Sequence, residues 1–158
     1  MTSENCFICK RIDQILEGTN PYFVAELETG YVVIGDYQLF HGYTLFLCKQ
    51  HQTELHFLNE NFKNQFLIEM SKVAEAVYKA FQPDKLNYEL LGNGDSHMHW
   101  HLFPRRTSDE INGPVWWTDQ AKMFSENVKP TDEERRQLKV ELFNELEKLV
   151  PVIRKGNF

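Results

Sequence analysis

Long apolar runs, an excess of positive charge and an export signal are all missing from this sequence of 158 residues. No stretch approaches the roughly 18 apolar residues that cross a membrane, and residues 1–5 lack the basic and apolar regions of a leader peptide. The 17 lysines and arginines are outnumbered by 23 aspartates and glutamates, which gives a net charge of −6 and does not favour broad binding to nucleic acid or anionic membrane. We therefore expect a soluble, cytoplasmic protein that would bind an anionic ligand only at a local site.

Cysteine is scarce, with three residues in the whole chain: Cys6, Cys9 and Cys48. An odd number of cysteines without an export signal argues against a disulfide framework, so these residues should be thiols or metal ligands. Cys48 falls in a predicted buried strand, where a free cysteine packs as a small apolar residue.

Internal repeats and low-complexity tracts are also missing, and a chain of this length suits one domain, residues 1–158, around a single core. Hydrophobic spacing, capping residues and β-rich runs predict helices within 6–18, 59–82 and 131–150, and strands at 23–28, 31–36, 43–48, 86–91 and 97–103. Because the strands flank a long helix without βαβ alternation, the expected fold is α+β, with a mostly antiparallel sheet of about five strands.

Residues 107–130 are weakly patterned, and Pro114 to Trp117 form their one dense apolar cluster. We predict a long ordered loop here. Trp116 and Trp117 could wall a base pocket, pack at a subunit contact or simply anchor this loop.

Three of the six histidines lie within five residues, at His97, His99 and His101, and alternate with Met98, Trp100 and Leu102. This alternation is typical of a half-buried strand, which would place the histidines on one face and the apolar residues on the other, with Pro104 ending the strand. A lone histidine, such as His41 or His56, is usually an ordinary polar residue. Three imidazoles on one face would rarely be kept without a metal or an anion to bind.

These residues resemble the histidine-triad (HIT) family of nucleotide hydrolases and transferases, whose signature is His-x-His-x-His-x-x with apolar x. Residues 6–10, Cys-Phe-Ile-Cys-Lys, look like the family's amino-terminal CxxC-K, and residues 42–51 resemble its Gly-His-x-Leu-Val-x-Pro-Lys-x-His segment. The tail at residues 103–106, Phe-Pro-Arg-Arg, resembles the branch that cleaves dinucleoside polyphosphates more than the branch with glycines after the triad. The resemblance implies the HIT fold.

The resemblance also implies roles for individual residues. His99, the middle histidine, would attack an α-phosphorus to form a nucleotidyl-histidine, and His101 would contact phosphate or leaving-group oxygens. Asp36 matches the position that holds the ribose hydroxyls. The loop at residues 92–96 is shorter than usual, so Asn93, Ser96 or backbone amides would supply its phosphate contacts.

A structural zinc site is expected in the amino-terminal segment, residues 1–20. Cys6 and Cys9 together with distant histidines fit the two-sulfur, two-nitrogen set that zinc prefers. Zinc-bearing HIT relatives use the first histidine of the triad as a ligand, which by resemblance assigns His97 here, and His51 would complete the set.

Tyr43 stands where many members have a histidine that supports the triad, and the sequence leaves open what replaces that histidine. Arg105 and Arg106 could contact phosphate or lie in solvent.

The favoured function is hydrolysis or transfer at the α-phosphate of a nucleotide conjugate such as diadenosine tetraphosphate, with adenosine phosphoramidates as the alternative substrates. A nucleotide-binding sensor or scaffold without turnover is a second hypothesis, and a redox or transition-metal centre is a third. The resemblance also implies a homodimer with a continuous sheet.

Overall fold

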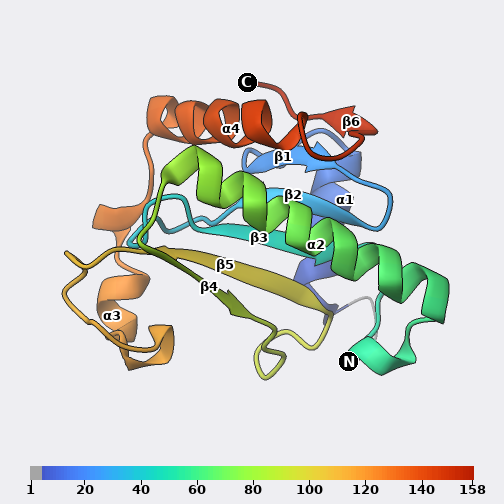
Figure 1. Cartoon of the computed structure of the whole chain (residues 1–158), viewed down its shortest axis with the longest axis horizontal. Coiled ribbons are helices and arrows are strands. Elements are labelled where there is room, and N and C mark those ends of the chain that lie inside the picture. The colour runs from blue at the N-terminus through green and yellow to red at the C-terminus, as the bar shows by residue number, and fades with distance from the viewer. Residues whose placement is uncertain (1–4) are drawn as a thin grey trace.

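The computed structural model describes residues 5–158, and its strands form a six-stranded sheet in which all neighbours are antiparallel (Figure 1). The order is β4-β5-β3-β2-β1-β6. The strands are β1 (Phe23–Glu26), β2 (Gly30–Ile34), β3 (Thr44–Cys48), β4 (Lys85–Glu89), β5 (His99–Arg105) and β6 (Arg154–Lys155). The helices are α1 (Phe7–Leu16), α2 (Glu60–Phe81), α3 (Gln120–Met123) and α4 (Asp132–Leu146), with 3-10 turns η2 (Leu55–Phe57), η3 (Val115–Trp117) and η4 (Glu126–Val128).

The two faces of the sheet have different covers. α2 and α4 lie over one face, where the main hydrophobic core forms, and α1 lies over part of the other face (Figure 1). Met98 and Leu102 are buried in the main core, with Trp100 packed against it, as the alternation predicted. Cys48 is fully buried in the same core, which confirms its packing role.

Local sequence accounts well for where the helices begin and end. The side chain of Asn59 caps α2, and Gln82 ends it in the left-handed conformation with φ of 45°. Thr131 and Glu134 form the predicted capping box of α4. Gly18 follows α1 with φ of 75°, a conformation that glycine adopts without strain.

Two expectations about the strands were wrong. β5 begins at His99, so His97 lies just before it, and the strand runs through Pro104 to Arg105. The carbonyl of Met98 accepts a hydrogen bond from β3, so the even-numbered residues of this segment direct their backbone polar groups to the β3 side. Pro104, which has no N–H, is one of these residues, but the pairing with β3 has already ended at Leu102. Pro104 therefore costs the sheet no hydrogen bond. The sixth strand, β6, was not predicted.

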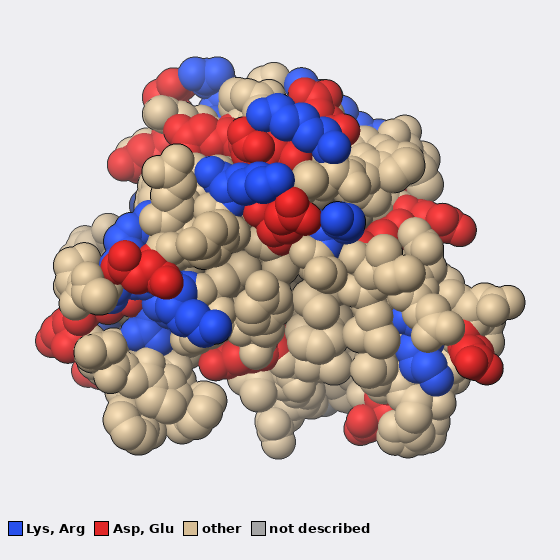
Figure 2. All heavy atoms as spheres, viewed as in Figure 1, with Lys and Arg blue, Asp and Glu red and all other residues tan. Residues whose placement is uncertain are grey.

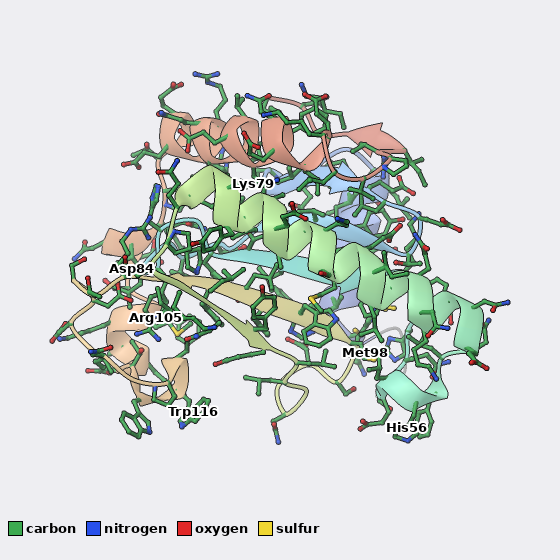
Figure 3. All side chains as sticks on the ribbon, viewed as in Figure 1. His56, Lys79, Asp84, Met98, Arg105 and Trp116 are labelled. Carbon is green, nitrogen blue, oxygen red and sulfur yellow. The ribbon has the colours of Figure 1, made fainter. Side chains whose placement is uncertain are left out.

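The loop at residues 107–130 is ordered by three short helical pieces, η3, α3 and η4. Arg105 lies at its base, while Trp116 is 70% exposed on its outer side (Figure 3). Over α4, positive and negative side chains lie interspersed on the surface (Figure 2). Within the described residues, every helix is too short or too polar to cross a membrane.

Candidate active site and metal-binding cluster

The three histidines lie on the face of the sheet that α1 covers. His97 and His99 are only 1% and 6% exposed, and the ring centroids of His99 and His101 are 4.6 Å apart. His99 and His101 pair in register with Leu47 and Leu45 of β3, which fixes their position on this face. The predicted shared face of the triad is therefore present.

A backbone contact sets which ring nitrogen of His99 carries the proton. Its Nδ1 lies 2.7 Å from the carbonyl oxygen of His97. A carbonyl oxygen only accepts, so Nδ1 carries the proton and donates it. Burial lowers the pKa of His99 below its usual range, so the ring is neutral near pH 7 and Nε2 holds the lone pair. Nε2 is the atom of His99 that can act as a nucleophile.

His101 has a side-chain partner instead. The hydroxyl of Tyr43 lies 2.6 Å from His101 Nδ1. Burial, and then the neighbouring His99, lower the pKa of His101 to about 3. Burial raises the pKa of Tyr43 far above its usual value, with a further increase from the charge of Asp36. Both groups are therefore neutral over the physiological pH range.

A cluster of two cysteines and two histidines joins the start of α1 to the start of β5. The ligand atoms of Cys6, Cys9, His51 and His97 all lie within 4.8 Å of one another. His97 Nδ1 is 3.6 Å from Cys6 Sγ and 3.4 Å from Cys9 Sγ, and His51 Nδ1 is 3.2 Å from Cys9 Sγ. The four predicted ligands are thus brought together from three separate segments.

The geometry and chemistry of this cluster suit a tetrahedral metal ion. Bonds of 2.3 Å to sulfur and 2.0–2.1 Å to nitrogen would separate ligand atoms by about 3.3–3.8 Å, close to the distances seen here. The Nε2 of His97 donates to the carbonyl of Cys48 at 2.8 Å, which aims the Nδ1 lone pair at the sulfurs. Without a cation, burial and then Cys6 raise the pKa of Cys9 to about 11. A bound metal would reverse this effect and stabilise thiolates.

A cavity of about 320 Å³ opens beside His99 and His101. Asp36 lines it and pairs with Arg11 of α1, and Asp95 adds a second carboxylate. The remaining lining residues are mostly apolar or aromatic: Phe7, Ile8, Val33, Tyr37, Tyr43, Leu45 and Phe124. Its size and mixed lining are typical of small-molecule sites.

The other predicted binding residues, Asn93 and Ser96, do not line this cavity. Asn93 is exposed in the loop between β4 and β5. The Oγ of Ser96 is buried and has no hydrogen-bond partner among the described residues. The roles of Asp36, Asn93 and Ser96 stay predictions.

The sequence reasoning missed the contributions of α1 and of the long loop. Phe7 and Arg11 lie one helical turn apart on α1, and both line the cavity. Phe124, from the end of α3, packs edge-on against Tyr37 with centroids 5.4 Å apart. The i, i+4 spacing of Phe7 and Arg11 was a local signal, whereas nothing local relates Phe124 to Tyr37.

Arg105 neither lies in solvent nor lines this cavity. It is 7% exposed, and its guanidinium bonds Asp109 at 2.7 Å and the carbonyls of Ile111 and Gly113 at 2.6 and 2.7 Å. Arg106 donates to the carbonyl of Phe81 at 2.6 Å. Arg105 thus fixes the start of the long loop, and Arg106 joins the end of β5 to the end of α2.

Comparisons with known proteins agree with this geometry. The family model described as "HIT domain" matches residues 25–108, more than half of the chain. "Protein hit" of Bacillus subtilis is 28% identical over 136 residues, which cover 82% of this chain and 88% of that protein.

Solved structures share the fold. A histidine triad protein from Bradyrhizobium japonicum has a TM-score of 0.69 at 24% identity, covering 78% of this chain and 89% of its own. A Zn-bound histidine triad family protein from Mycobacterium smegmatis has a TM-score of 0.61 at 21% identity, covering 92% and 98%. The fold, with its antiparallel sheet and histidine strand, is that of HIT proteins. The chain belongs to the HIT domain family and is a nucleotide-binding or hydrolase-type protein of that family.

Proposed function

We propose that this protein cleaves nucleotide conjugates at the α-phosphate through a covalent intermediate on His99. The observation that carries the proposal is the 2.7 Å contact from His99 Nδ1 to the carbonyl of His97, which leaves the Nε2 lone pair available next to His101. An imidazole of this kind is a good nucleophile towards phosphorus and also a good leaving group in the second step.

In the first step His99 Nε2 forms a bond to the α-phosphorus, and the bond from phosphorus to the leaving group breaks, with the electron pair departing on the leaving group. The proton on Nδ1 stays there, held by the His97 carbonyl. In the second step a water oxygen, or another acceptor, attacks phosphorus and releases its proton to solvent. The N–P bond then breaks, the nucleotide is released and the lone pair returns to Nε2. His101 would stabilise charge on the phosphate or leaving-group oxygens.

We also propose that Cys6, Cys9, His51 and His97 hold one structural zinc ion. The donor set, the ligand spacing and the hydrogen bond behind His97 support this assignment. When bound, zinc would supply a closed tetrahedral link between α1 and the histidine strand. Since His97 would be occupied in this way, His99 is left to react.

Two substrate classes follow from different observations. The tail at residues 103–106 favours dinucleoside polyphosphates on sequence grounds. The charge of the cavity favours the second candidate, adenosine phosphoramidates: among the described lining residues Arg11 carries the only positive charge, and Asp36 neutralises it. With Asp95 nearby, a neutral or amine leaving group would be repelled less than a polyphosphate.

One experiment tests the function and ranks the substrates. Wild-type protein, His99→Ala and the control His56→Ala are given diadenosine tetraphosphate and an adenosine phosphoramidate, with products identified by mass spectrometry. His56 is exposed on η2, away from the cavity. We expect turnover by the wild type and the control but none by His99→Ala. When the wild-type reaction is run with substrate labelled at the α-phosphate and then quenched, an acid-labile, base-stable label should be found on the peptide that contains His99. Label on another residue would refute the mechanism, and binding without turnover would support the sensor hypothesis instead.

A further inference from the structure

The hydroxyl of Tyr43 is hydrogen-bonded to Nδ1 of His101, although the two residues are 58 positions apart in the chain. We propose that Tyr43 is a positioning residue that holds His101 in the tautomer with its proton on Nε2. His101 would then present an N–H donor to substrate oxygens beside the His99 nucleophile. This inference rests on the proposed function for its consequence, although the tautomer itself can be measured without any substrate.

The direction of the hydrogen bond follows from the partners available. If His101 Nδ1 carried the proton and donated it, the hydroxyl hydrogen of Tyr43 would need a second acceptor. Among the described residues, His101 Nδ1 is the single hydrogen-bond partner of this hydroxyl. A buried hydroxyl without an acceptor is costly, so the hydroxyl donates and Nδ1 accepts. The raised pKa of Tyr43 and the lowered pKa of His101 keep one proton on each group, as this arrangement requires.

The surroundings of Tyr43 hold its ring in place from several sides. Its ring stacks on Phe103 with centroids 4.3 Å apart and planes 6° from parallel. Its carbonyl accepts from Gly35 N at 2.8 Å and from Gln38 Nε2 at 3.0 Å. A Cβ at position 35 would lie 2.1 Å from the tyrosine ring, so the ring position requires glycine there. A side chain held this firmly can fix the proton position of its partner.

The tautomer matters because the two forms of His101 act oppositely on phosphate. With the proton on Nε2, the ring donates to an oxygen whose negative charge grows in the transition state. With the proton on Nδ1, Nε2 presents a lone pair, which repels that oxygen. Loss of the tyrosine hydroxyl should therefore lower kcat more than it changes KM.

The direct test is ¹⁵N NMR of the histidine side chains in the substrate-free protein, since protonated and unprotonated ring nitrogens have well-separated shifts. In the wild type, and in the control Tyr31→Phe, His101 should have an unprotonated Nδ1 and a protonated Nε2. Tyr31 is a buried tyrosine on β2 outside the cavity lining. Tyr43→Phe keeps the stacked ring but removes the donor, and it should show a mixture of the two tautomers.

Kinetics supply the second readout. We expect kcat of Tyr43→Phe to fall about tenfold, the usual effect of one lost hydrogen bond, with KM within about twofold. Tyr31→Phe should match the wild type. Tyr43→His keeps a donor near Nδ1 and should recover part of kcat, which a purely structural role of the ring would not produce.

The outcomes separate the inference from the proposed function. A protonated Nδ1 in the wild type, or Tyr43→Phe with unchanged ¹⁵N shifts and unchanged kcat, overturns the inference. The expected shifts in a protein that turns over none of the nucleotide conjugates support the tautomer assignment and overturn the proposed function.

Discussion

At the residue scale, the burial of His101 should make folding stability depend on pH. The pKa of His101 is about 3 in the folded protein and near 6.5 in an unfolded chain. The unfolded state therefore takes up the proton first, so stability is complete above about pH 6.5 and is lost as the pH falls towards 3. Lowering the pH from 7 to 5 should reduce the free energy of unfolding by about 2 kcal/mol through this one group. Urea unfolding of the wild type and of His101→Gln at both pH values measures the difference.

His56→Gln is the matched control, because His56 is exposed on η2. We expect the control to lose stability on acidification as the wild type does, and His101→Gln to lose about 2 kcal/mol less. Equal losses in all three proteins would show that His101 titrates in the folded state as it does in the unfolded chain.

Single residues differ in how far the sequence revealed them. The shared face of the triad could be predicted because side-chain alternation is a local property of a strand. The resemblance pointed to the position of Tyr43 but left its contact with His101 open, since the pair is 58 residues apart and depends on how β3 and β5 align. The pairing of Asp36 with Arg11 escaped prediction for the same reason: nothing in the sequence relates the residues just after β2 to α1.

At the element scale, the proposed zinc site would tie α1 to the start of β5. Cys9→Ser removes one of four ligands, so we expect the metal content to fall well below one zinc per chain, with a melting temperature several degrees lower. Elemental analysis and thermal unfolding on the same samples measure both quantities.

Cys48→Ala is the control for this experiment. Cys48 is fully buried in the main core, so its truncation should lower stability through lost packing while the zinc content stays at one per chain. A wild-type protein that is active and free of zinc, with Cys9→Ser melting at the same temperature, would contradict the zinc assignment.

Arg105 should stabilise the long loop instead of binding substrate. Arg105→Met leaves Asp109 and the carbonyls of Ile111 and Gly113 without their donor, so we expect a loss of about 2–4 kcal/mol and faster protease cleavage within residues 107–117. Arg136→Met, at an exposed ion pair with Glu133, should leave stability almost unchanged, because solvent screens that pair. A large increase in KM with unchanged stability would assign Arg105 to phosphate after all.

Elements with strong local signals were predicted well, and those made by tertiary pairing were not. α2 and α4 carry periodic apolar faces and capping residues, and both begin within a residue of the expected position. β6 consists of two residues that are strand only because they pair with β1. Likewise, Pro104 can lie inside β5 only because β3 has already ended, which is a property of the neighbouring strand.

At the scale of the whole molecule, β4 is an edge strand that has residues able to pair with another chain. The even-numbered residues of β5 direct their backbone N–H and C=O groups to β3, and the odd-numbered ones direct theirs to β4. The odd-numbered residues of β4 are paired with these odd-numbered residues of β5. Leu86 and Tyr88 therefore turn their backbone N–H and C=O groups outward. Tyr88, Leu91 and Trp116 are 50%, 52% and 70% exposed near this edge. An open edge with exposed apolar side chains favours association.

We therefore propose a homodimer in which β4 strands of two copies pair to continue the sheet. A two-fold axis would bring the same edge of each copy together and leave no free edge at that point. Light scattering at micromolar concentration should give about twice the chain mass of 18.7 kDa.

Tyr88→Pro removes the outward N–H without touching a bond to β5, so it should yield a monomer. Ile153→Pro, next to β6 at the opposite edge, has its N–H bonded to Glu26 and should destabilise the fold without selectively splitting the dimer. A wild-type mass near 18.7 kDa would refute the dimer, and a dimeric Tyr88→Pro would place the interface elsewhere.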